Sequence, residues 1–171
     1  MIKTFIHFLV LFIVMVLVQI VCNNICLFGV AVPLLYIYFI VRLPINISPN
    51  WTMTLSFLMG LIVDIFANTQ GMHALASTIT AACRQTVFGL YFSREDDLAD
   101  PTPSIRTLGS AIFLKYLFSI TLLQCTLLFL IQAFTLHHAT ITILRIVCST
   151  LLSTLLIFGI DSLISSREKR L

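Results

Sequence analysis

The sequence predicts an all-α membrane protein whose six transmembrane helices pack in one bundle. Of its 171 residues, 59% are hydrophobic and only 10% are charged, and the mean hydropathy is +1.06. A soluble domain is typically about 25% charged, so this chain lacks the polar residues that a water-exposed surface requires. The apolar residues also fall into long runs, and a helix needs about 20 of them to cross a bilayer. We therefore expect a single transmembrane domain over residues 1–171.

The first three spans are expected in the N-terminal half. Residues 4–22 form a retained first span, because no A-x-A-like cleavage site of a signal peptide follows the run. The run at 27–41 is shorter and contains Pro33, whose ring removes a helix hydrogen bond, so a short span and a re-entrant segment are both open. Residues 51–67 form the third span, and Trp51 is placed to anchor it at the membrane interface.

The other three spans are expected in the C-terminal half. Residues 72–92 are rich in small and polar side chains, so this fourth span gains little from facing lipid and is expected inside the bundle. The loop at 93–106 holds four of the seven acidic residues, and its docking on a basic cytoplasmic partner is a hypothesis. The fifth and sixth spans are expected at 107–134 and 141–164, before a tail at 165–171.

The orientation follows from the Lys and Arg residues near the ends of the spans, which favour the cytoplasm. With six spans, one side of the membrane receives Lys3, Arg42, Arg94, Arg106, Arg167, Lys169 and Arg170. The opposite loops contain no Lys or Arg, so both termini are expected in the cytoplasm. If residues 27–41 failed to cross, the later bases would lie opposite Lys3, which favours six spans. These bases form no clustered face, so no nucleic-acid partner is expected.

A stripe of small and polar residues follows one face of the third span. Its members are four residues apart: Ser56, Gly60, Asp64 and Asn68. A second polar face, at offsets of 0, 4, 7 and 11 on the fourth span, consists of His73, Ser77, Thr80 and Arg84. Either the two stripes pack as a helix hairpin, or they form the wall of a site. We expect a packing seam for most of these residues, and a structural and docking role for Asp64.

Five ionisable residues lie inside the apolar runs: Asp64, Arg84, Lys115, Arg145 and Asp161. Each costs roughly 2.5–3.5 kcal/mol at the bilayer centre. Asp64 and Arg145 both lie about 5–6 Å below the same outer surface, so we expect them to pair. Arg84 and Lys115 both lie about 12 Å from the cytoplasmic surface. They either extend toward the cytoplasm or line a shared polar cavity.

The sequence contains no pattern typical of an enzyme. HExxH, GxSxG and Walker-type loops are absent, and Asp64 and Asp161 lie at opposite ends of their spans, which excludes an aspartyl dyad. The five cysteines have no regular spacing, and the pair His137-His138 has no neighbouring carboxylate or cysteine ligand. We therefore expect no catalytic residue, no metal and no cofactor. The residues expected to serve packing or partner binding are Gly60, Asp64, Gly71, His73, Arg84 and Arg145.

The motif Gly60-Leu-Ile-Val-Asp64, followed by Gly71-Met-His73-Ala-Leu75, resembles the MreD family of bacterial rod shape-determining membrane proteins. That family shares a Gly-x-x-x-Asp pattern in a middle span and a Gly-x-(His/Arg)-Ala-type start to the next one. Pro33 in the second run also fits the family pattern. The resemblance implies a fold similar to the substrate-binding subunits of energy-coupling-factor transporters.

The resemblance also implies a function. It indicates a non-enzymatic scaffold in the bacterial inner membrane that binds MreC and acts in peptidoglycan synthesis during cell elongation. Through that complex it would link cytoplasmic MreB filaments to RodA and its penicillin-binding transpeptidase. The similar transporter fold leaves a second hypothesis from another class, a vitamin-binding subunit of an energy-coupling-factor importer.

Overall fold

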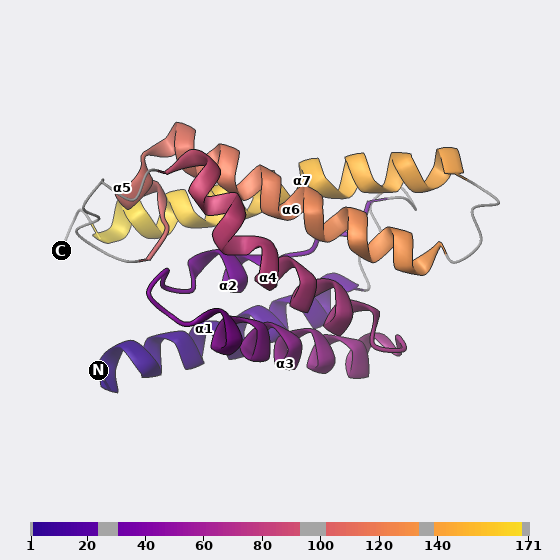
Figure 1. The fold of residues 1–171 in the computed structure, drawn as a ribbon, viewed down its shortest axis with the longest axis horizontal. Coiled ribbons are helices and arrows are strands. Elements are labelled where there is room, and N and C mark those ends of the chain that lie inside the picture. Colours follow the sequence, from indigo (N-terminus) through magenta and orange to yellow (C-terminus); the bar gives the residue numbers. More distant parts are fainter. Residues whose placement is uncertain (1, 24–30, 93–101, 134–138, 169–171) are drawn as a thin grey trace.

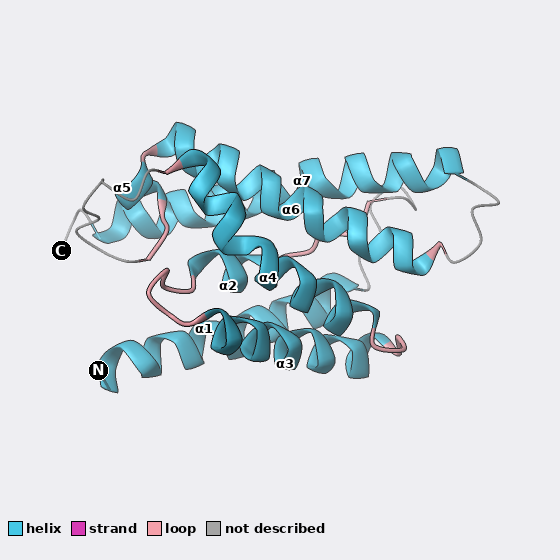
Figure 2. Ribbon diagram, viewed as in Figure 1, coloured by secondary structure: helices cyan, strands magenta, loops and turns pink. Residues whose placement is uncertain are grey.

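The computed structural model describes residues 2–23, 31–92, 102–133 and 139–168, and helices account for most of them. In chain order they are α1 (Ile2–Asn23), α2 (Ile37–Arg42), α3 (Pro49–Ala67), α4 (Met72–Tyr91), α5 (Ile105–Leu108), α6 (Ser110–Gln132) and α7 (Ala139–Glu168). No strand forms within these ranges, as Figure 2 shows, so the predicted all-α class is confirmed.

The long helices lie roughly along one axis in two layers (Figure 1). Helices α1 and α3 form one layer, and α6 and α7 form the other. Helix α4 crosses between them and has extensive contacts with both α3 and α6. We call the end where α1 begins and α7 ends the terminal end, and the opposite end, with the α3–α4 turn, the turn end.

Among the described residues, four helices are long and apolar enough to cross a membrane, which indicates a multi-pass membrane protein. These candidate spans are Ile6–Asn23, Pro49–Ala67, Ser110–Gln132 and Thr140–Ser165. Helix α4 is 20 residues long but is not among them. Seven of its residues, all small or polar, are nevertheless buried in the protein. That location agrees with the interior position expected for residues 72–92.

The run at 27–41 is not one continuous helix. Residues 31–36 are non-helical, and α2 begins only at Ile37 and spans six residues. At 1.5 Å per residue, α2 is about 9 Å long, far shorter than a hydrocarbon core of about 30 Å. The expectation of a helical second span is therefore wrong for the described part of this run.

Side chains from α1 hold the non-helical segment in place. Gln19 is fully buried, and its Oε1 accepts hydrogen bonds from the backbone N–H groups of Leu35 (2.7 Å) and Tyr36 (3.3 Å). Its Nε2 donates to the carbonyl of Pro33 at 3.1 Å. Backbone polar groups in an apolar interior require such partners, because an unpaired one costs about 1–3 kcal/mol. Gln19 therefore replaces the hydrogen bonds that a helix would have made.

Helix α7 holds the same segment from the other side. The N–H of Val32 donates to Ser149 Oγ at 3.0 Å, and that of Leu34 donates to Ser153 Oγ at 2.8 Å. Farther along α7, Asp161 binds Arg42 at the end of α2. The twelve residues from Ser149 to Asp161 extend about 18 Å along a helix. The segment thus runs beside α7 toward the terminal end, in the direction expected for the second crossing.

Candidate functional site

Helices α3 and α4 approach each other most closely at Gly60. A Cβ atom on Gly60 would lie 2.6 Å from both the Cα of Ala74 and the carbonyl oxygen of His73. One turn earlier, the Ser77 hydroxyl donates a hydrogen bond to the backbone carbonyl of Ser56 at 2.8 Å. Real Cβ contacts are never this short, so the backbones can pack at this distance only because residue 60 has no side chain.

Asp64 caps the N-terminus of α4 from the preceding helix. Its Oδ1 accepts the N–H of His73 (3.0 Å) and the hydroxyl of Thr69 (2.5 Å), and its Oδ2 accepts the N–H of Ala74 (2.8 Å). The N-cap residue itself, Gly71, has no side chain that could do this. The carboxylate is only 2% exposed, and its charge is stabilised by the positive end of the α4 dipole. The residues of the motif therefore form one structural unit.

The turn between the two helices depends on two left-handed residues. Asn68 ends α3 at φ 54°, and Gly71 precedes α4 at φ 75°. Asn68 is exposed, so its expected place in the packing seam is wrong. Its backbone leaves the helix at this residue, which moves its side chain away from the stripe that Ser56, Gly60 and Asp64 follow.

His73 begins a chain of buried polar groups that the sequence did not predict. Its Nδ1 lies 3.2 Å from the hydroxyl of Tyr36, in the non-helical segment, and Gln124 Nε2 on α6 donates to the same hydroxyl at 2.6 Å. The three side chains are buried and join three parts of the fold. One feature of the sequence indicates these contacts: Gln124 lies within an otherwise apolar run, and a buried amide requires hydrogen-bond partners.

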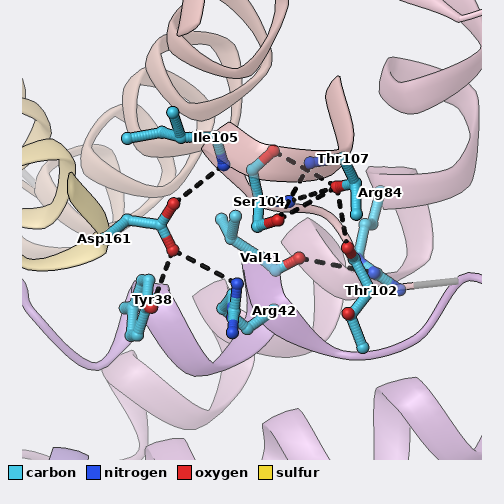
Figure 3. A network of polar contacts seen from close by, with 9 residues as sticks. All are labelled: Tyr38, Val41, Arg42, Arg84, Thr102, Ser104, Ile105, Thr107 and Asp161. Carbon is cyan, nitrogen blue, oxygen red and sulfur yellow. Dashed lines mark hydrogen bonds and ion pairs between the residues drawn. The ribbon is translucent and has the colours of Figure 1, made fainter. Parts of the chain in front are cut away.

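A second polar cluster lies near the terminal end (Figure 3). Asp161 on α7 is 1% exposed, and its Oδ1 accepts from the Tyr38 hydroxyl at 2.8 Å and from Arg42 Nη1 at 3.3 Å. Its Oδ2 accepts the N–H of Ile105, at the start of α5, at 2.9 Å. The cluster therefore joins α2, α5 and α7, and it contains the ion pair found in the described part of the chain.

Arg84 occupies the protein interior beside this cluster, as Figure 3 shows. It is 2% exposed, and its Nε donates to the Tyr116 hydroxyl at 3.1 Å. Its Nη2 donates to the carbonyl of Leu43 and, at 3.5 Å, to that of Val41. Helix α2 leaves such carbonyls unpaired at its C-terminus. Because Arg84 is buried and Lys115 is exposed, the two cations do not line a shared cavity, and Arg84 does not extend toward the cytoplasm.

The ion pair expected between Asp64 and Arg145 is not formed. Arg145 is exposed on α7, whereas Asp64 is buried and accepts its hydrogen bonds from Thr69 and the first turn of α4. Counting residues placed the two side chains at the same depth, but α3 and α7 are not among the helix pairs with extensive contacts. An estimate of depth from the sequence does not say which helices are neighbours in the bundle.

A cavity of about 270 Å³ opens beside the α3–α4 turn. Its walls come from the ends of α1, α3 and α6 and from the non-helical segment, with apolar side chains such as Leu34 and Phe129. Its polar side chains are Asn23, Thr69, His73 and Gln132, and no Asp, Glu, Lys or Arg lines it. Its volume is slightly below the 300–1,000 Å³ or so of typical ligand sites.

Several expectations concern residues outside the described ranges. They include the acidic residues Glu95, Asp96, Asp97 and Asp100 and the pair His137-His138. Within the described ranges, no three His, Cys, Asp or Glu residues are grouped so that they could hold a metal ion. Cys22, Cys83, Cys125 and Cys148 are free thiols in the structure.

Comparison of the chain with protein-family models, with curated proteins and with solved structures finds no match. The assignment of function therefore depends on the sequence motif and on the geometry of the two polar clusters and the cavity.

Proposed function

We propose that this protein is a non-enzymatic scaffold of the cell-elongation machinery in a bacterial inner membrane, with both termini in the cytoplasm. It binds MreC and, through it, connects MreB filaments with RodA and its penicillin-binding transpeptidase. The observation that carries the proposal is the convergence of Gly60, Asp64, Gly71 and His73, the four positions of the MreD-like motif, on one α3–α4 hairpin.

The use of these residues supports a scaffold. Both carboxylate oxygens of Asp64 accept backbone N–H groups, and Gly60 permits direct contact between two helices. A catalytic carboxylate would instead present an oxygen to a substrate. The motif stabilises a rigid helix hairpin. A rigid surface is what a protein requires if it positions its partners and catalyses no reaction.

The surface of the helices is suited to lipid and to partner helices. Large apolar side chains are exposed on α1, including Leu9, Ile13 and Leu17, and on α7, including Leu151 and Leu155. In a membrane this surface contacts acyl chains wherever no partner covers it. The single transmembrane segment of MreC is the partner that the proposal places on it.

Co-purification tests this function directly. The tagged full-length protein is extracted from a rod-shaped host in mild detergent, and MreC is expected in the eluate. Gly60→Val should reduce the recovered MreC, because the α3–α4 hairpin cannot close around a larger side chain. Gly89→Val is the matched control, because a Cβ at this α4 position meets no atom within 4 Å and Gly89 lies outside the α1 and α7 surface assigned to MreC. Absence of MreC with the wild-type protein would contradict the proposal.

Depletion gives an independent readout. Loss of the protein is expected to turn rod-shaped cells round, and unchanged cell shape would exclude the scaffold function. Genes for MreB and MreC immediately upstream would support it further.

The cavity near His73 favours a second candidate function, the small-molecule-binding subunit of an energy-coupling-factor importer. This candidate predicts that paired ATPase subunits, and not MreC, co-purify with the chain. The same eluate therefore distinguishes the two candidates.

A further inference from the structure

The hydrogen bonds around Tyr36 favour one tautomer of the His73 ring, because the Tyr36 proton has His73 Nδ1 as its acceptor. Gln124 Nε2, which can only donate, lies 2.6 Å from the Tyr36 hydroxyl, so that oxygen accepts. The Tyr36 proton is then free to point at His73 Nδ1, 3.2 Å away. A neutral imidazole that accepts at Nδ1 carries its proton on Nε2. His73 lines the cavity, and among the described residues its Nε2 has no hydrogen-bond partner.

A second donor lies in the same cavity. Asn23 Oδ1 accepts a hydrogen bond from Gln19 Nε2 at 3.2 Å, which leaves its Nδ2 free to donate. By contrast, the Thr69 hydroxyl donates its proton to Asp64, so Thr69 offers the cavity only an acceptor. With His73 in the tautomer that these contacts favour, His73 and Asn23 each present a donor to the cavity.

The cavity also selects against charge. Among the described residues that line it there is no Asp, Glu, Lys or Arg, and a charged group without a partner of opposite charge is expensive to bury. An anion would in addition lie near the Asp64 carboxylate, which binds the backbone of His73. A cation would meet the two donors. The remaining walls are apolar and favour an uncharged molecule with an apolar body.

We propose that this cavity binds a small uncharged molecule whose carbonyl-type oxygen accepts the Nε2 proton of His73. The apolar part of the ligand lies against Leu34 and Phe129, and Asn23 provides a second donor. Binding of such a molecule is compatible with both candidate functions: a ligand could regulate a scaffold, or it could be the cargo of an importer subunit. The ligand proposal is tested by binding of small-molecule probes, whereas the scaffold function is tested by recovery of MreC, so either one can fail without the other.

Four probes of nearly identical shape test the proposal on the full-length protein in detergent. Benzamide is neutral and carries the acceptor, benzoate is an anion, benzamidinium is a cation, and toluene has no acceptor. Ligand-observed NMR measures saturable binding of each one. Benzamide is expected to bind most tightly. Equal or tighter binding of either charged probe, or of toluene, would overturn the proposal.

Two variants distinguish the cavity from the detergent micelle. Ala67→Phe fills the cavity from its α3 wall and should abolish benzamide binding. Ile65→Phe introduces the same side chain two residues away on the exposed face and should leave binding unchanged. Benzamide binding that survives in Ala67→Phe would place the probe elsewhere and contradict the proposal.

His73→Phe tests the donor itself and should weaken benzamide binding about five- to tenfold, the usual effect of one lost hydrogen bond. Because this variant could misfold, the ring nitrogens of ¹⁵N-histidine-labelled wild-type protein provide a second test. The His73 Nε2 resonance should be of the protonated type and should shift when benzamide is added. An unprotonated Nε2, or a resonance that benzamide leaves unchanged, would refute the assignment.

Discussion

The N–H of Ala74 donates a hydrogen bond to Asp64 Oδ2 at 2.8 Å, so a side chain near the end of α3 caps the start of α4. Ten residues separate the two partners, and the turn between them contains two left-handed residues, Asn68 and Gly71. A carboxylate at this position satisfies helix N–H groups that otherwise lack partners. This contact explains why an aspartate is tolerated in an apolar run without a cationic partner.

Asp64→Ala should destabilise the fold because it leaves the N–H groups of His73 and Ala74 buried without an acceptor. We expect a loss of about 2–6 kcal/mol, from two unsatisfied donors at about 1–3 kcal/mol each. Thermal unfolding in detergent measures it. Asp64→Asn retains an acceptor and should lose less. Because removal of a buried charge eases membrane insertion, the amount of protein in the membrane should fall less than the amount of recovered MreC.

Gly60→Ala should be destabilising although alanine is the better helix former. The added Cβ would lie 2.6 Å from backbone atoms of α4, and backbone cannot rotate away as a side chain can. Overpacking of this kind typically costs about 1–3 kcal/mol. In Gly159→Ala the Cβ meets nothing within 4 Å, so helix propensity should stabilise that variant by up to about 1 kcal/mol. Equal melting temperatures for the two variants would contradict the proposed close contact.

The positions of the long helices could be predicted from the sequence because each coincides with an apolar run. The non-helical segment at residues 31–36 could not, since five of its six residues are as apolar as those of the helices that flank it. Pro33 indicated a disturbance but not its extent. The extent depends on Gln19, Ser149 and Ser153, which replace the helical hydrogen bonds and come from distant parts of the chain.

The partners of the buried charges were predictable only in part. The sequence places Asp64 and Arg145 at the same depth, yet the ion pair that forms is the one between Arg42 and Asp161. Depth follows from counting residues along a span, but pairing also requires neighbouring helices. Capping of α4 by Asp64 required the reversal of the chain at Asn68 and Gly71, which no periodicity reveals.

The pair Arg42–Asp161 should show strong energetic coupling, because its carboxylate is 1% exposed. Arg42→Met leaves that charge with only Tyr38 and the Ile105 N–H, and breaking a buried pair costs about 3–5 kcal/mol. Asp161→Asn should cost less because the Arg42 side chain, 13% exposed, can reach solvent. A double-mutant cycle on unfolding free energies measures the coupling. Strictly additive effects would mean that the pair contributes nothing.

Ser153→Ala should destabilise the protein by about 1–3 kcal/mol, because the buried N–H of Leu34 loses its acceptor. The neighbouring Thr154 provides a matched control on the same helix, since its buried hydroxyl makes no hydrogen bond to any residue that the structure describes. Thr154→Val removes only that unpaired hydroxyl and should be neutral or stabilising. Hydrogen exchange at the Leu34 amide is the local readout, and it should accelerate in Ser153→Ala alone.

Two substitutions of Arg84 separate the contribution of its charge from that of its hydrogen-bonding geometry. Its guanidinium reaches the carbonyls of Leu43 and Val41 and the Tyr116 hydroxyl at the same time, which the single nitrogen of lysine cannot do. Arg84→Lys keeps a buried charge but loses acceptors, so it should destabilise at least as strongly as Arg84→Met. Arg84→Met removes the charge while leaving two carbonyls unpaired, at about 1–3 kcal/mol each. Thermal unfolding of both variants decides the question. If lysine restored wild-type stability, charge alone would matter, and the capping of α2 by the guanidinium would be incidental.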